Sequence, residues 1–194
     1  MKTLRFIVVV LACATIHQTH AQATGLNLPF HYAHPLVDGA TGIIPSTVIG
    51  LGIQHDFDRR IGMGVDVNYG SSQEEQVRSL EVIYSAKFFA TDNDRTAVYI
   101  GSLIGFQRLS GTSPKYSTTQ NGPVTGGEEY SHIQIPIGLR AGLRGGLQGY
   151  FGELFAQVGY ALGNGELYTS NGIAVNSAPI YFSVGFSFLG FGWE

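Results

Sequence analysis

The sequence is poor in charged residues. Only 13% of its 194 residues are Asp, Glu, Lys or Arg, against roughly a quarter in an ordinary soluble domain. Glycine is frequent instead, at 27 residues, and aromatic residues reach 12%. We therefore expect part of the surface to face something other than water. The formal net charge of −3 lacks the basic excess of a nucleic-acid-binding protein, so no nucleic-acid partner is expected.

The chain has one cysteine, Cys13, so it cannot form a disulfide framework. Cys13 lies inside an apolar run, residues 6–16, close to the start. A lipoprotein cleavage box ending at Cys13 is one interpretation, but Leu11 fits that box poorly. We favour an incidental thiol in a segment that is removed on export, because a better cleavage site follows.

No apolar run in the chain approaches the roughly 20 residues of a transmembrane helix. The first residues are basic, the apolar run 6–16 follows, and Ala21-Gln22-Ala23 is a cleavage site with small residues at both ends. We interpret residues 1–23 as the signal peptide of an exported protein. Residues 24–194 are expected to form one domain without a helical membrane anchor.

Alternation with a period of two residues recurs along this domain. In residues 131–143 the odd positions from Ile133 onward are Ile, Leu or Ala, whereas the even positions include His, Gln, Arg and Gly. Successive side chains of a strand point to opposite faces, so this segment has one apolar and one polar face. The same split predicts eight strands, over residues 26–32, 47–57, 61–70, 77–89, 96–109, 131–143, 150–163 and 180–188.

Short and long connections alternate between these strands. The short ones are residues 58–60, 90–95 and 145–149, and the long ones are residues 71–76, 110–129 and 164–179. Bacterial outer-membrane barrels have short periplasmic turns, long external loops and an even number of strands. Lipid offers no partner for an open sheet edge, so the sheet must close. We predict an all-β fold, an eight-stranded antiparallel up-and-down transmembrane β-barrel.

The polar face decides between lipid and water as the surroundings. It is built from Gly, Ser, Asn and Gln with few charges, which suits a narrow interior better than a solvated exterior. A soluble secreted β-sandwich, with the two faces reversed, is the structural alternative. Aromatic residues near the strand ends are expected to form two girdles at the membrane interfaces: Tyr32, Phe57, Tyr69, Phe88, Phe106, Tyr150, Tyr160, Phe182 and Phe188.

The segment Ile133-Gln134-Ile135-Pro136-Ile137-Gly138-Leu139 is similar to an Ile-Pro strand common in the outer-membrane β-barrel domain family. Over residues 26–193 the chain resembles the small eight-stranded barrels of the OmpA and OmpX type. The resemblance implies a bacterial outer-membrane location, with outer-membrane lipid and the barrel-assembly machinery as partners. Family members commonly end on an aromatic residue that this machinery recognises, whereas this chain ends on Glu194.

Charged residues on the inward face are expected to form a hydrogen-bonded network in the lumen, because buried charges are costly unless they are paired. They are Asp56, Asp66, Glu81, Lys87, Arg140, Arg144 and Glu153. Antiparallel pairing across residues 145–149 places Glu153 beside Arg140, or between Arg140 and Arg144. The network is expected to act as a plug, and a gated or selective narrow pore is the alternative.

Pairing across residues 71–76 places Asp66 beside Glu81. These two carboxylates then need a cation from the opposite wall, for which Arg140 and Lys87 are the candidates.

Catalysis needs a nucleophile beside a base. Ser131 and His132 are neighbours on one strand and face opposite sides, so they cannot form such a pair, although His31 and His132 could meet inside. The sequence has no metal-ligand cluster and no phosphate loop, so neither a cofactor nor a metal is expected. We predict a non-enzymatic outer-membrane barrel with a structural or surface-interaction role. Residues 110–129 are a candidate contact surface for a ligand, although a mobile solvated loop is the favoured interpretation of this segment. The alternatives are a narrow pore, an outer-leaflet lipid-modifying enzyme and the soluble sandwich.

Overall fold

The computed structural model describes most of the predicted domain. The described residues are 23–35, 47–57, 60–72, 77–91, 96–112, 116–117, 124–125, 127–147, 150–163, 166–168, 174–176 and 180–192. Residues 1–22, which include Cys13 and nearly all of the predicted signal peptide, lie outside these ranges. Within the described ranges there is no helix with the length and apolar character needed to cross a membrane.

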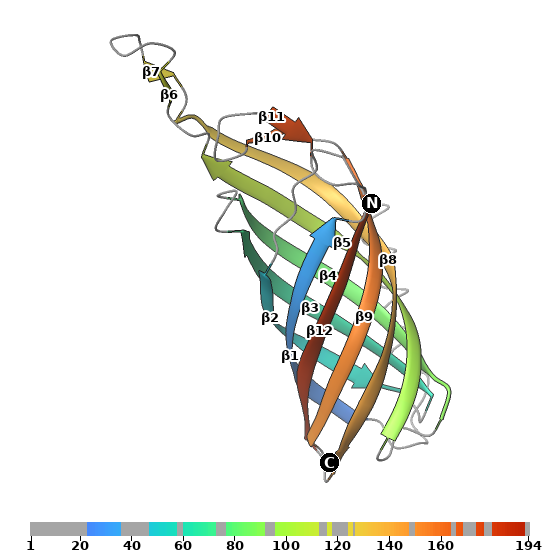
Figure 1. Ribbon diagram of the computed structural model, residues 1–194. Coiled ribbons are helices and arrows are strands. Elements are labelled where there is room, and N and C mark those ends of the chain that lie inside the picture. The colour runs from blue at the N-terminus through green and yellow to red at the C-terminus, as the bar shows by residue number, and fades with distance from the viewer. Residues whose placement is uncertain are drawn as a thin grey trace, which may run out of the picture.

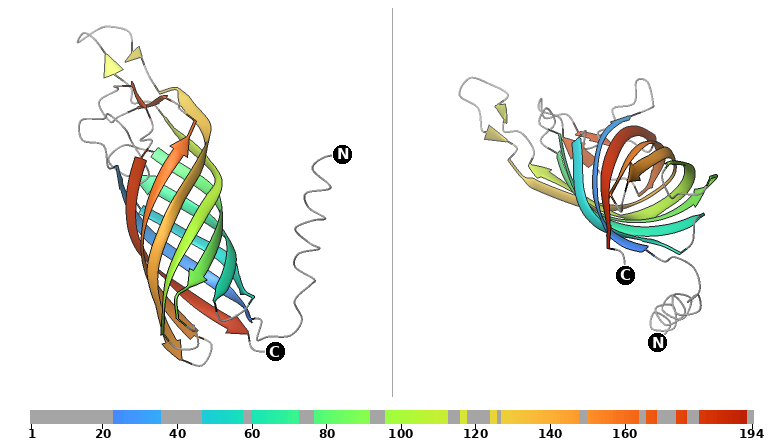
Figure 2. Two further views of the ribbon diagram at one scale, coloured as in Figure 1. Left: turned by 90° about the vertical axis from the view of Figure 1, so that its right-hand side faces the viewer. Right: turned by 90° about the horizontal axis from the view of Figure 1, so that it is seen from below.

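Eight long strands form a closed antiparallel barrel in which each strand pairs with its neighbours in the chain, and the last strand pairs with the first (Figure 1). They are β1 (Ala23–Pro35), β2 (Thr47–Asp56), β3 (Ile61–Ser72), β4 (Val77–Phe89), β5 (Thr96–Thr112), β8 (Glu129–Leu147), β9 (Tyr150–Leu162) and β12 (Ile180–Gly192). Figure 2 shows the closed wall from the side and from below. The predicted eight-stranded up-and-down barrel is confirmed.

Side-chain exposure alternates along the strands as the sequence pattern predicts. On β8, Leu139 is 71% exposed and its neighbour Arg140 is 7% exposed. The same contrast holds around the barrel, where Ile, Leu and Val side chains of the outer face are exposed and polar side chains of the inner face are buried. A continuous exposed aliphatic surface suits hydrocarbon and would be unfavourable in water. The alternative of a soluble β-sandwich is therefore wrong, because its aliphatic side chains would share a dry centre.

The long connections contain strands that the sequence pattern did not predict. β5 continues to Thr112 and β8 begins at Glu129, so this pair of strands extends past the rim of the barrel (Figure 1). Between them β6 (Tyr116–Ser117) pairs with β7 (Val124–Thr125), and in the next long connection β10 (Glu166–Tyr168) pairs with β11 (Ala174–Asn176). No strand was assigned to these connections from the sequence. The short pairs form because backbone N–H and C=O groups of antiparallel segments bond to each other.

Glycines on the inner face allow close approach between the wall and large lumen side chains. A Cβ atom added at Gly142 on β8 would lie 2.6 Å from the Leu154 carbonyl oxygen and 2.7 Å from the Tyr99 hydroxyl oxygen. Gly152 on β9 lies on the outer face instead, and a Cβ atom added there would meet nothing closer than 3.9 Å. Only the first of these two positions requires glycine for packing.

Gly142→Ala is expected to lower the free energy of unfolding by about 1–3 kcal/mol, because the added methyl group presses on a backbone carbonyl that is held in the sheet. Gly152→Ala is the matched control, with an expected change within about 0.5 kcal/mol. Urea titrations of both variants folded into lipid vesicles measure the difference. Equal effects of the two substitutions would contradict the close packing at Gly142.

Candidate functional site

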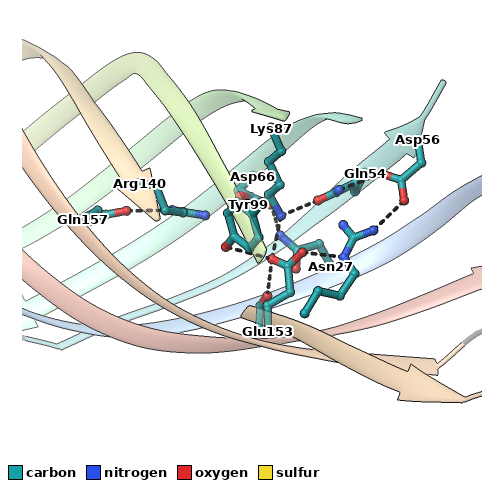
Figure 3. A network of polar contacts seen from close by, with 11 residues as sticks. Asn27, Gln54, Asp56, Asp66, Lys87, Tyr99, Arg140, Glu153 and Gln157 are labelled. Atoms are coloured by element: carbon teal, nitrogen blue, oxygen red, sulfur yellow. Dashed lines mark hydrogen bonds and ion pairs between the residues drawn. The ribbon is translucent and has the colours of Figure 1, made fainter. Parts of the chain in front are cut away.

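Glu153 on β9 lies at the centre of the polar contacts in the lumen and is only 1% exposed. Its Oε2 atom accepts from Lys87 Nζ of β4 at 2.6 Å, and its Oε1 atom accepts from Arg144 Nε of β8 at 2.8 Å. The Tyr99 hydroxyl also donates to Oε2 at 3.3 Å, and the Ser187 hydroxyl does so at 3.4 Å. One carboxylate therefore joins four other strands across the barrel (Figure 3).

The two cations beside Glu153 are also linked to each other through two residues of the opposite wall. Arg144 Nη1 donates to Asp56 Oδ2 at 2.6 Å, and Lys87 Nζ donates to Gln54 Oε1 at 2.6 Å. Gln54 Nε2 in turn donates to Asp56 Oδ1 at 2.9 Å. The five residues form a closed circuit of polar contacts with two acids and two bases, which we call the lumen network. The two acids and two bases cancel, so the lumen network itself carries no net charge.

Aromatic side chains cover the lumen network. The Arg144 guanidinium lies 4.3 Å from the centroid of the Phe89 aromatic ring and 5.8 Å from that of Phe151. Phe89 and Tyr99 belong to a buried cluster inside the barrel, and their aromatic rings contact each other edge to face. These rings exclude water from the ion pairs, which strengthens the pairs electrostatically. Sequence analysis did not identify these aromatic residues as lumen residues.

The register between β8 and β9 differs from the predicted one. Glu153 lies opposite Arg144, while Arg140 lies opposite Gln157. Strand β8 continues to Leu147, past the end predicted for it, so only residues 148–149 separate the two strands. Arg140 donates from Nε and Nη2 to Gln157 Oε1, at 3.0 and 2.8 Å. Figure 3 shows this pair to one side of the contacts around Glu153.

The two remaining acids do not meet each other as predicted. Strand β3 continues to Ser72, so Glu81 lies opposite Asn68 and Asp66 lies opposite Ile83. Asp66 accepts from Asn27 Nδ2 at 2.7 Å.

Glu81 accepts from the Ser79 hydroxyl at 3.1 Å and from Gln107 Nε2. Among the described residues no cation lies within ion-pair distance of Asp66 or Glu81. The predicted pairing of these acids with Arg140 or Lys87 is therefore wrong, because neutral amide and hydroxyl donors satisfy the carboxylates.

A small cavity remains in the lumen between Glu81 and Arg140. It has a volume of about 30 Å³, and His31 and Gln134 also line it. A space of this size holds a water molecule or two. It is far smaller than the aqueous channels of wide porins.

The other residues singled out in the sequence are distributed as follows. Ser131 faces outward and its hydroxyl accepts from Arg108 Nε at 2.9 Å, while His31 is buried and contacts the Phe155 aromatic ring edge to face. The described residues contain no group of three or more His, Cys, Asp or Glu that could hold a metal ion. Of the predicted girdle residues Phe57 and Phe182 are partly exposed, and the more exposed ones are Tyr32, Tyr69, Phe88, Phe106, Tyr150, Tyr160 and Phe188.

Comparison with known proteins identifies the fold. No protein-family model matches the sequence, and no curated protein matches it. Among solved structures, the N-terminal β-barrel domain of OprF from Pseudomonas aeruginosa matches with a TM-score of 0.50 and 10% identity, over 89% of this chain and 99% of that one. Neisserial surface protein A matches with a TM-score of 0.56 and 10% identity, over 87% of this chain and 96% of that one.

At this level of identity the likeness concerns the fold, which is that of the small eight-stranded outer-membrane barrels. The predicted resemblance to that group is confirmed. The chain has the fold of the outer-membrane β-barrels, and its exposed aliphatic belt is a surface of the kind that such a barrel presents to lipid.

Proposed function

We propose that the protein is a non-enzymatic barrel of the bacterial outer membrane, with a closed lumen and a structural or surface-contact role. In this proposal residues 1–23 are a signal peptide that is removed on export. Outer-membrane lipid surrounds the barrel, and the barrel-assembly machinery inserts it.

The lumen network is the observation that carries this proposal. Ion pairs at 2.6–2.8 Å join Glu153 to Lys87 and Arg144, and Arg144 to Asp56 on the opposite wall. Buried aromatic side chains cover these ion pairs. A buried network in which every charge is paired makes an interior rigid. Ion pairs across the lumen therefore favour a closed, plugged barrel over a conducting pore.

The extension of β5 and β8 supports the surface-contact role. These strands carry the β6–β7 hairpin past the rim, away from the aliphatic belt (Figure 1). Segments that project from a rigid scaffold are where outer-membrane barrels meet partners. One structural neighbour is named a surface protein, and we propose that residues 110–129 contact a surface ligand in this protein.

The wild-type protein is expected to give no steady open-channel current in planar lipid bilayers, because ion pairs and aromatic side chains cross the lumen. Heat-modifiable migration on gels and flotation with vesicles show beforehand that the protein is folded and inserted. A steady current from inserted wild-type protein would contradict the plug and would support the narrow pore.

A further inference from the structure

A polar groove lies on the outer face of the barrel, where β3, β4, β5 and β8 approach the long connections. It has a volume of about 830 Å³. We call it the arginine groove and define it by six of its lining residues, Tyr69, Ser71, Arg78, Arg108, Ser110 and Ser131. None of these residues belongs to the lumen network.

The arginine groove begins where the aliphatic belt ends. Arg108 lies in one row of the sheet with two exposed aliphatic residues, Leu80 on β4 and Ile133 on β8. The next row toward the loops is polar. It contains Ser71, Arg78, Ser110 and Ser131. Two guanidinium groups therefore stand at the depth where hydrocarbon gives way to lipid headgroups, with apolar stems that pack along the belt.

Among the described residues these two cations have no ion-pair partner. Within the part of the chain that the structure describes, no carboxylate lies within ion-pair distance of Arg78 or Arg108. Glu129 is the acid that lines the same groove, so its basic groups outnumber its acids by two to one. The Arg108 Nε atom donates to the Ser131 hydroxyl at 2.9 Å, which orients its guanidinium while both Nη groups stay available.

We propose that the arginine groove binds the phosphate group of an anionic lipid in the adjacent membrane leaflet. Arginine presents paired N–H donors that match the oxygens of a phosphate, and the serine hydroxyls beside it add further donors. The acyl chains of the same lipid continue along Leu80 and Ile133. This continuity with the belt selects a phospholipid or a phosphorylated glycolipid over free phosphate. The inference rests on the proposed membrane location.

The test uses the folded full-length chain in detergent micelles, titrated with bis-phosphorylated lipid A. Native mass spectrometry counts the lipid molecules that each protein retains. The double variant Arg78→Gln/Arg108→Gln is expected to bind at least about tenfold more weakly than wild type. Arg60→Gln removes the same charge from an exposed residue at the short-turn end of the barrel, and its affinity is expected to stay within about twofold of wild type.

Three outcomes would overturn the proposal. They are wild-type affinity in the folded double variant, equal retention of lipid A from which both phosphates have been removed, and displacement of the lipid by an equal concentration of inorganic phosphate. The Arg78→Lys/Arg108→Lys variant is expected to bind more weakly than wild type and more tightly than the glutamine variant, because lysine keeps the charge without the paired donors. Conductance and flotation test the proposed function separately, so the two failures are distinguishable.

Discussion

Replacing Glu153 with glutamine is expected to lower the free energy of unfolding by about 3–5 kcal/mol, the usual effect of removing one partner from a buried ion pair. The substitution keeps the shape of the side chain but removes the charge that faces Lys87 and Arg144. Both cations are at most 3% exposed, so neither can turn to water without opening the barrel. Urea unfolding in lipid vesicles measures the change.

Two further variants separate the loss of the ion pairs from a general effect of the substitution. Glu129→Gln makes the same chemical change at an exposed position beyond the rim, where we expect a change within about 0.5 kcal/mol. Adding Lys87→Met to Glu153→Gln removes one of the two cations that have lost Glu153 as a partner, and it is expected to restore part of the lost stability. If Glu153→Gln costs no more than Glu129→Gln, the lumen network does not stabilise the barrel.

Placing an arginine at Leu139, in the middle of the exposed belt, is expected to destabilise the barrel by about 2–4 kcal/mol in a bilayer. Leu139 is 71% exposed on β8, so the substitution causes no steric clash in the lumen. The expected cost comes from placing a charge among acyl chains, and it falls toward about 0–1 kcal/mol near the membrane interface.

Leu26→Arg provides the control at the interface. Leu26 is 60% exposed, and it lies in a row of the sheet with Gly190 and Tyr150, close to the short turns. The same urea titrations compare the two variants. If Leu139→Arg is no more destabilising than Leu26→Arg, the aliphatic belt does not face hydrocarbon.

The alternation of side chains accounts for what could be predicted from the sequence. The period of two places Leu139 outside and Arg140 inside without any knowledge of the partner strands. Strand number follows from the same pattern, because each crossing needs its own alternating segment. The closed barrel then follows from the absence of partners for an edge in lipid.

The pairing of individual charges could not be predicted in the same way. It depends on where each strand ends, and β3 and β8 both continue beyond their predicted ends. A shift of a few residues along the pair moves Glu153 from the neighbourhood of Arg140 to that of Arg144. The positions of charged residues in the sequence also do not show that a carboxylate pairs with neutral donors, as Glu81 does.

The lumen aromatic residues were missed although a signal was present. Phe151 and Phe155 share the inward alternation of Glu153, and Phe89 shares that of Lys87. Composition favoured small and polar residues for the interior, so these aromatic residues were assigned to neither face. Alternation is the more reliable guide here, because it is imposed by strand geometry, whereas large inner side chains are accommodated by glycines opposite them on the neighbouring strand.

The contacts of Arg144 and Lys87 also bear on the order of events during assembly. Arg144 and Asp56 are separated by 88 residues in the sequence, and Lys87 and Glu153 by 66. Such distant partners meet only after most hairpins have formed and the wall has begun to close. Contacts that form late slow the reverse reaction more than they speed the forward one. We therefore expect the inserted barrel to unfold slowly, because the long-range ion pairs of the lumen network form late in assembly and must break early in unfolding.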